Sequence, residues 1–174
     1  MSKIILLGYM GVGKSTLGKL ISQRLDKDFC DLDTAIEEAF QLPVHTVFKT
    51  KGELAFRKEE KNQLHKLLDQ DIDLIFSLGG GTPFYYDNAD FIFDQNEFQT
   101  IYLTSALQNL TKRLLLEKDV RPLISHLQSE AELEDFIRKH LFERHHVYDR
   151  AMHKVSVDEK SPDAIADEII SLLS

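Results

Sequence analysis

The sequence has few of the features that would place it outside the class of small soluble proteins. It contains a single cysteine, Cys30, which excludes an intramolecular disulfide framework and suits a reducing compartment. Its apolar runs are no longer than a β-strand, and Met1-Ser2-Lys3 leads directly into one of them, so we expect neither a membrane span nor a signal peptide. These absences predict a cytoplasmic protein.

Positive charge is also scarce, since 21 Lys and Arg stand against 29 Asp and Glu and give a formal net charge of −8. Binding to nucleic acid depends on neutralising phosphates, so this balance argues against a nucleic-acid partner. An anionic ligand must then be met by a few basic side chains gathered at one place. The histidines form no H-x-x-x-H pair, because Arg144 stands four residues after His140, and we expect no structural metal site.

Length and composition indicate one folded unit. Residues 1–174 are enough to bury a full core and too few for two ordinary domains, and no repeat or low-complexity linker interrupts them. Apolar runs of strand length alternate with helical patterns along the chain. This alternation predicts a three-layer α/β fold, in which a parallel sheet of about five strands lies between helices.

The most specific motif follows the apolar run at 3–7, where residues 8–16 read GYMGVGKST. This segment matches G-x-x-x-x-G-K-[ST], and apolar residues recur at helical spacing after it. Strand, glycine loop and helix predict a nucleoside triphosphate site, because backbone N–H groups and the helix N-terminus face the phosphates. Lys14 would reach the outer phosphates and Ser15 would coordinate Mg²⁺. The residues predicted to contact the nucleotide are Gly11, Val12, Gly13, Lys14, Ser15 and Thr16.

A pair of carboxylates follows the first predicted helix. Asp31 and Asp33 end a short predicted strand, and alternation would place both on one face at its C-terminal end, where ligands of parallel sheets bind. The pair suggests Asp31 for the Mg²⁺ shell and Asp33 for the hydroxyl of an acceptor. Helix capping is the alternative for Asp33, because a helix is predicted over 34–40.

Two further segments carry candidates for binding an acceptor. Arg57 and Glu60 are three residues apart on a predicted polar helix, so the acid can orient the guanidinium, although a solvated charged face is the ordinary explanation. Three glycines at 79–81 follow a second predicted core strand and leave bare backbone facing the ligand crevice. This strand lacks the aspartate that often ends it in phosphate-loop proteins, which favours Asp31 for the metal.

The segment from about 117 to 128 is predicted to be a mobile lid. Pro122 stops a helix and favours an extended Arg121 before it. An arginine on a polar loop can meet a phosphoryl group when the loop closes. A linker with a solvated arginine is the open alternative.

Local signals predict where the later helices begin. Ser105-Ala106-Leu107-Gln108 and Ser129-Glu130-Ala131-Glu132 both resemble a capping box. Ser161 followed by Pro162 fits an N-cap with proline at the first helical position. We therefore expect helices to start at these three serines.

In their order along the chain, these motifs resemble shikimate kinase over essentially the whole sequence. The resemblance includes the phosphate loop, the D-x-D pair, G-E-x-x-F-R-x-x-E at 52–60, the three glycines, R-P-L at 121–123 and R-x-x-x-Y at 144–148. It implies ATP-dependent phosphorylation of the 3-hydroxyl of shikimate, with Mg²⁺ and an acceptor-binding region at about 33–61. It also implies a monomer, with a fold like that of nucleoside monophosphate kinases and strand order 2-3-1-4-5.

The resemblance assigns a role to each candidate residue. Lys14, Asp33 and Arg121 would be catalytic, and Arg121 would also contact ATP. Ser15 and Asp31 would hold the metal. The residues implied for shikimate binding are Asp33, Arg57, Gly79, Gly80, Gly81 and Arg144.

Two other functions compete with this interpretation. Another small-molecule kinase of the same fold, such as gluconate kinase, would share the phosphate loop but not the combination of 52–60 with Arg144. A nucleotide-binding module without turnover would be expected to lack Asp33 or Arg121, and both are present. Arg113 resembles the family's adenine-side arginine. The expected partners are two small molecules, ATP and shikimate, without nucleic acid or membrane.

Overall fold

The computed structural model describes residues 2–118 and 121–173, and within them five strands form one sheet in which every neighbouring pair is parallel. Residues 1 and 174 of the predicted domain, and 119 and 120 of the predicted lid, lie outside the described residues. The strand order is β2-β3-β1-β4-β5, which confirms the order 2-3-1-4-5. The strands are β1 (Lys3–Leu7), β2 (Asp28–Asp31), β3 (Leu74–Ser77), β4 (Phe98–Thr104) and β5 (His153–Ser156).

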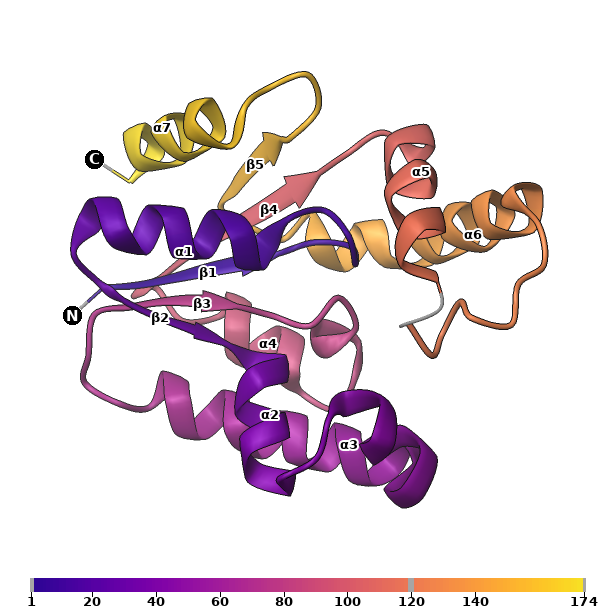
Figure 1. Cartoon of the computed structure of the whole chain (residues 1–174). Helices are drawn as coiled ribbons and strands as arrows, with labels where there is room; N and C mark the ends of the chain where they lie inside the picture. Colours follow the sequence, from indigo (N-terminus) through magenta and orange to yellow (C-terminus); the bar gives the residue numbers. More distant parts are fainter. Residues whose placement is uncertain (1, 119–120, 174) are drawn as a thin grey trace.

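Helices cover both faces of this sheet and give the predicted three layers (Figure 1). Buried side chains of α1, α5, α6 and α7 pack against one face, and those of α2, α3 and α4 pack against the other. The helices are α1 (Lys14–Leu25), α2 (Leu32–Phe40), α3 (Val44–Leu68), α4 (Asn88–Phe93), α5 (Leu107–Glu117), α6 (Glu130–Tyr148), α7 (Pro162–Leu172) and the short 3₁₀ helix η1 (Thr82–Phe84).

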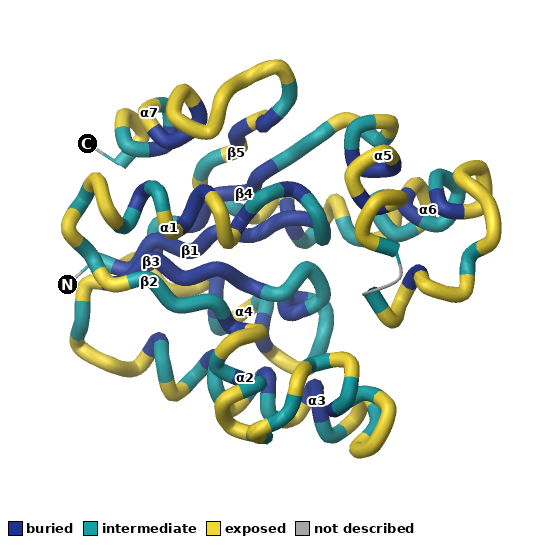
Figure 2. Tube along the Cα trace, in the orientation of Figure 1, coloured by how far each residue is buried: buried dark blue, intermediate teal, exposed yellow. Residues whose placement is uncertain are grey.

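The central strand β1 shows why the sheet is buried on both sides. All five of its residues are buried, as the dark blue trace in Figure 2 shows. Side chains alternate across a strand, so Ile4 and Leu6 join the core that contains α1 and α7, whereas Ile5 and Leu7 join the core that contains α2 and α3. A strand between two helical layers is therefore a continuous apolar run.

The structure corrects the start of α2. This helix begins at Leu32, and its N-cap is Asp31, whose Oδ1 accepts a hydrogen bond from the backbone N–H of Asp33 at 3.0 Å. Asp33 therefore lies in the first helical turn and not on the strand. The prediction from strand alternation was wrong, and the capping role belongs to Asp31.

The structure also corrects the start of α5. Its N-cap is Ala106, which has no capping side chain, and the predicted capping box at Ser105 is absent. A carboxylate from the loop after β5 takes this place. Asp158 Oδ2 accepts a hydrogen bond from the backbone N–H of Ala106, and Asp158 Oδ1 accepts one from the Ser105 hydroxyl, both at 2.6 Å.

Two other helix starts agree with the sequence. Ser129 and Ser161 are the N-caps of α6 and α7, and each hydroxyl oxygen accepts a backbone N–H bond at 3.2 Å. Helix α3 contains a kink at Gly52, where φ is 83°, so the short and the long predicted helices meet there. Among the described helices, none combines the length and the apolar character needed to cross a membrane.

Candidate functional site

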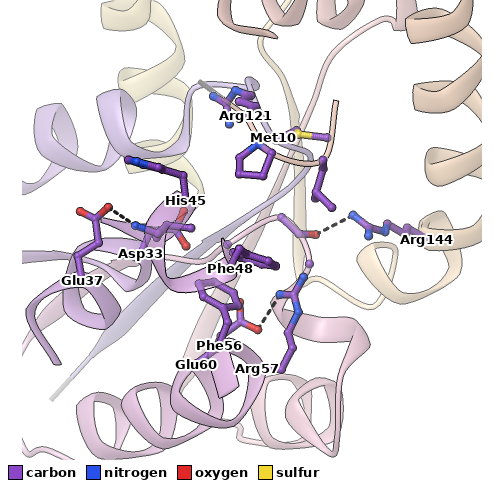
Figure 3. Close-up of a pocket in the computed structure, with 16 residues that line it drawn as sticks. Met10, Asp33, Glu37, His45, Phe48, Phe56, Arg57, Glu60, Arg121 and Arg144 are labelled. Carbon is purple, nitrogen blue, oxygen red and sulfur yellow. Dashed lines mark hydrogen bonds and ion pairs between the residues drawn. The ribbon is translucent and has the colours of Figure 1, made fainter. Parts of the chain in front are cut away.

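Two adjoining cavities lie beside the loops that follow β1, β2 and β3. The loop cavity, of about 260 Å³, is lined by the glycine loop and the end of β2. The arginine cavity, of about 290 Å³, contains Arg57 and Arg144 (Figure 3). Ligands of parallel α/β sheets bind at such strand ends. The residues that line both cavities are Met10, Asp33, Gly79, Gly80 and Arg121.

The glycine loop holds a buried cation. Gly13 precedes α1 with φ 106°, a conformation that only glycine adopts readily. Lys14 follows it with 8% of its surface exposed, and its Nζ donates to the carbonyls of Gly8 at 2.8 Å and Tyr9 at 3.0 Å. Burial lowers the pKa of Lys14 to about 8, although the Asp33 carboxylate opposes this change. The cation is thus held at the loop, where it can meet an anionic ligand.

A hydroxyl and a carboxylate meet at the edge of the loop cavity. The Ser15 hydroxyl donates to Asp31 Oδ2 at 2.5 Å. Within residues 2–118 and 121–173, no cluster of three or more His, Cys, Asp or Glu is arranged to hold a metal ion. Mg²⁺ is commonly bound by one or two protein oxygens together with water and substrate phosphates. The pair therefore fits a Mg²⁺ ion that arrives with a nucleotide.

Asp33 lies where the two cavities meet. Solvent reaches its side chain through the open cleft, yet protein atoms crowd the carboxyl group. This burial, together with the charges of Asp31 and Glu60, raises the pKa of Asp33 to about 6, although Lys14 opposes the shift. A carboxylate with such a pKa is ionised at neutral pH and is a better proton acceptor than an ordinary aspartate.

The pair of Arg57 and Glu60 is buried, so the solvated-face alternative is wrong. Arg57 is 5% exposed and Glu60 is fully buried, and Nη1 of Arg57 donates to Oε2 of Glu60 at 2.9 Å. The guanidinium also lies 4.0 Å from the ring centroid of Tyr85. Burial acts to lower the pKa of Arg57, but the Glu60 carboxylate outweighs it and raises this pKa. The arginine stays charged at the wall of the cavity.

The glycines at 79–81 allow close approach by basic side chains. A Cβ atom on Gly81 would lie 3.0 Å from both terminal nitrogens of Arg57, so any larger residue there would displace the guanidinium from its present position. The carbonyl oxygen of Gly80 accepts hydrogen bonds from Arg144 Nη1 at 3.4 Å and from the Tyr148 hydroxyl at 2.5 Å. Helix α6 is thereby joined to this turn, and Arg57 and Arg144 face the same space (Figure 3).

Arg121 lies at the boundary between the two cavities. Its Nε donates to Glu117 Oε2 at 2.8 Å, and its charge contributes to the lowered pKa of Lys14. Pro122 and Leu123 line the arginine cavity beside it. The described part of the predicted lid therefore borders the candidate site through these three residues.

Several side chains that line the arginine cavity were missed from the sequence. Glu37 lies one helical turn after Asp33, and this i,i+4 spacing was the signal that would have placed both on one face of α2. The apolar lining residues, by contrast, look like ordinary core positions in a sequence, so their pattern gave no signal that they line a cavity. The missed residues are Met10, Glu37, Val44, His45, Phe48 and Phe56.

Comparison with known proteins covers nearly the whole chain. The family model described as shikimate kinase matches residues 10–174. A shikimate kinase from Flavobacterium psychrophilum is 39% identical over 173 residues, which are 99% of each chain.

Solved structures agree with this match. The crystal structure of shikimate kinase from Bacteroides thetaiotaomicron has a TM-score of 0.88 and 34% identity, and the match covers 99% of this chain and 98% of that one. Shikimate kinase from Acinetobacter baumannii in complex with shikimate has a TM-score of 0.87 and 28% identity, over 99% and 93% of the two chains. The chain therefore belongs to the shikimate kinase family.

Proposed function

We propose that this chain transfers the γ-phosphoryl group of ATP to the 3-hydroxyl of shikimate and yields shikimate 3-phosphate and ADP. The observation that carries the proposal is the position of Asp33, whose carboxylate borders both the loop cavity and the arginine cavity. One group can thus face a phosphoryl donor and a hydroxyl acceptor together. Membership of the family and the likeness to a shikimate-bound relative support the choice of acceptor.

The arginine cavity suits a small hydroxylated carboxylate. Arg57 and Arg144 supply two planar guanidinium groups, which pair well with one carboxylate. Phe48 and Phe56 add apolar surface on which the carbon ring of shikimate can lie. Backbone groups at 79–81 are open to the ligand because these residues have no side chains.

The loop cavity suits the phosphates of ATP. Backbone N–H groups of residues 11–16 would bind the phosphates, and Lys14 would neutralise the outer ones. Ser15 and Asp31 would hold Mg²⁺. When bound, MgATP supplies a γ-phosphoryl group whose charge is partly neutralised by the metal.

In the proposed step, the oxygen of the 3-hydroxyl forms a bond to the γ-phosphorus, and the bond between that phosphorus and the bridging oxygen to the β-phosphate breaks. The electron pair of the broken bond stays with ADP. Asp33 orients the hydroxyl and accepts its proton. Arg121 stabilises the charge on the transferring phosphoryl group when the lid closes.

A coupled assay of ADP release tests the function. ADP release with shikimate as acceptor and no release with gluconate is the expected result. Preference for gluconate would favour the related small-molecule kinase instead. ATP binding without ADP release from either acceptor would favour a nucleotide-binding module without turnover.

The proposal also includes a monomeric enzyme in the cytoplasm. The single cysteine supports a reducing compartment, and the net charge of −8 supports the expectation that nucleic acid is not a partner. Light scattering across a range of protein concentrations tests the monomer.

A further inference from the structure

A buried chain of polar groups lies behind the wall of the arginine cavity. Glu60 is fully buried, and each of its carboxylate oxygens has a separate partner. Oε2 accepts from Arg57 Nη1 at 2.9 Å, and Oε1 accepts from the Thr82 hydroxyl at 2.7 Å. A buried carboxylate requires such partners because burial removes its hydration. Arg57 and Thr82 together therefore determine how Glu60 lies.

Thr82 is itself held from several directions. It is fully buried, and its backbone N–H donates to the Gly79 carbonyl at 3.1 Å. Its own carbonyl oxygen accepts from Asn88 Nδ2 at 2.9 Å, and Asn88 is also fully buried. The hydroxyl is thus presented to Glu60 from a fixed backbone.

These buried polar groups extend to the place where the two cavities meet. A Cβ atom on Gly79 would lie 2.9 Å from the Thr82 hydroxyl oxygen, 3.1 Å from Glu60 Oε1 and 3.3 Å from Asp33 Oδ1. The hydroxyl donor therefore lies near two carboxylates that repel each other. By donating to Glu60, it offsets part of this charge and favours one orientation of the Glu60 side chain.

Thr82 does not line either cavity, whereas Glu60 and Arg57 do line the arginine cavity. We propose that Thr82 is a positioning residue for the acceptor: its hydroxyl fixes Glu60, and Glu60 fixes the guanidinium of Arg57 that binds the acceptor carboxylate. The proposal depends on the acceptor role of Arg57 given above. If Thr82 only stabilises the fold, its loss lowers the melting temperature and leaves the kinetic constants unchanged.

The test compares Thr82→Val with Thr82→Ser. Valine has nearly the shape of threonine but cannot donate a hydrogen bond, so we expect KM for shikimate to rise about tenfold, with KM for ATP unchanged. Serine keeps the hydroxyl and should restore KM for shikimate to within about twofold of wild type. A valine variant with the wild-type KM for shikimate would overturn the proposal, whatever its melting temperature. Thr82→Ala provides the same comparison if the valine variant does not fold.

A matched control and a double variant separate positioning from stability. Thr100 is 4% exposed on β4, and its hydroxyl oxygen accepts from the backbone N–H of Met152 at 2.9 Å. Thr100→Val makes the same change at another buried hydroxyl and should leave KM for shikimate unchanged. Because Thr82 acts through Arg57, Thr82→Val should add little to KM in an Arg57→Lys background. If the two substitutions raised KM for shikimate by fully additive free energies, Thr82 would not act through Arg57.

Wild-type activity separates the two proposals. Absence of turnover with shikimate in the wild type would contradict the proposed function. Wild-type turnover combined with an unchanged KM for shikimate in Thr82→Val, or in Thr82→Ala if the valine variant does not fold, would contradict only the role of Thr82.

Discussion

The carboxylate of Asp33 is the side chain on which the proposed chemistry most depends. It is crowded by the negative charges of Asp31 and Glu60, and these raise its pKa together with burial, which is the larger cause. The same environment that makes it a good proton acceptor makes its charged form costly to the fold. Function and stability therefore favour opposite properties at this position.

Asp33→Asn should lower kcat by at least about a hundredfold, because the amide cannot accept the proton of the hydroxyl. The melting temperature at pH 8 should be unchanged or raised. The pKa of about 6 exceeds the ordinary value of 3.8, so the folded protein gains stability as pH falls below 6 and loses it as pH rises through 6. Contact with solvent in the cleft reduces this effect. Both quantities are measured on the same preparation, and a near-normal kcat would contradict the catalytic role.

The pH dependence of the wild type provides the control for this variant. Below about pH 6 the protonated form of Asp33 increases, so kcat should fall by about tenfold for each further pH unit. The residual kcat of Asp33→Asn should lack this acid limb. An identical acid limb in both proteins would assign it to another group.

Arg57→Lys should raise KM for shikimate and leave KM for ATP nearly unchanged. Lysine keeps the positive charge but loses the planar group that pairs with Glu60 and with a carboxylate ligand. The expected increase in KM is about tenfold or more. Equal increases in both KM values would place Arg57 outside the acceptor site.

The chemical type of the site residues could be predicted from the sequence, but how deeply each side chain is buried could not. A pair such as Arg57 and Glu60 is common on solvated helices, and only long-range packing shows that both are buried. Burial depends on Tyr85 and Thr82, which approach from beyond β3. The sequence pattern around Arg57 and Glu60 carries no signal for these contacts, because Tyr85 and Thr82 lie more than twenty residues further along the chain.

At the scale of the elements, the positions where helices begin show which local signals in the sequence are reliable. Ser129 and Ser161 were found because an N-cap and its first turn are adjacent in the chain. Ser105 gave the same local signal and was misread, because Asp158 supplies the acceptor from 52 residues away. The α2 start was misplaced by two residues for a related reason, since Asp31 both ends β2 and caps α2.

Asp158→Ala should lower the free energy of unfolding by about 1–2 kcal/mol and leave kcat unchanged. The carboxylate accepts hydrogen bonds from Ser105, the Ala106 N–H and Asn109, and each would lose its partner. Burial acts to raise the pKa of Asp158, but these bonds outweigh it and lower the pKa. The stabilisation is therefore present above the unfolded pKa and is lost as pH falls through the lower folded value.

Chemical denaturation at pH 7 measures this loss, and Ser105→Ala is the matched control. Ser105→Ala removes one of the three donors to Asp158, so it should lower the free energy of unfolding by less than Asp158→Ala does. If both variants unfolded at the wild-type denaturant concentration, the Asp158 carboxylate would not act as a cap.

At the scale of the whole molecule, alternating motifs predicted the three-layer fold, and the resemblance to a family implied the strand order. Parallel strands joined through helices allow few arrangements, and β1, which precedes the phosphate loop, lies at the centre of the observed order β2-β3-β1-β4-β5. Candidate residues from six distant segments then meet at one edge of the sheet. Their convergence required the resemblance to a family, because spacing alone does not specify which strands are neighbours.

Arg121→Ala should lower kcat about a hundredfold or more while changing shikimate affinity without nucleotide by less than about threefold. Arg121 borders the loop cavity and the arginine cavity, and its neighbours Pro122 and Leu123 extend over the latter. In the proposed mechanism Arg121 meets charge that develops on the phosphoryl group when the lid closes, and this charge is absent from the complex with shikimate alone.

Calorimetry with shikimate alone and steady-state kinetics with both substrates measure the two effects. Arg138→Ala is the matched control, because Arg138 is an exposed arginine on α6 that pairs only with neighbouring acids Glu134 and Asp135 among the described contacts. It should retain the wild-type kcat. In the proposed closure the lid covers both cavities at once, so loss of Arg121 should lower kcat much more than it lowers the affinity for shikimate. If shikimate affinity fell as far as kcat, Arg121 would belong to the open acceptor site and closure would not be the step at which it acts.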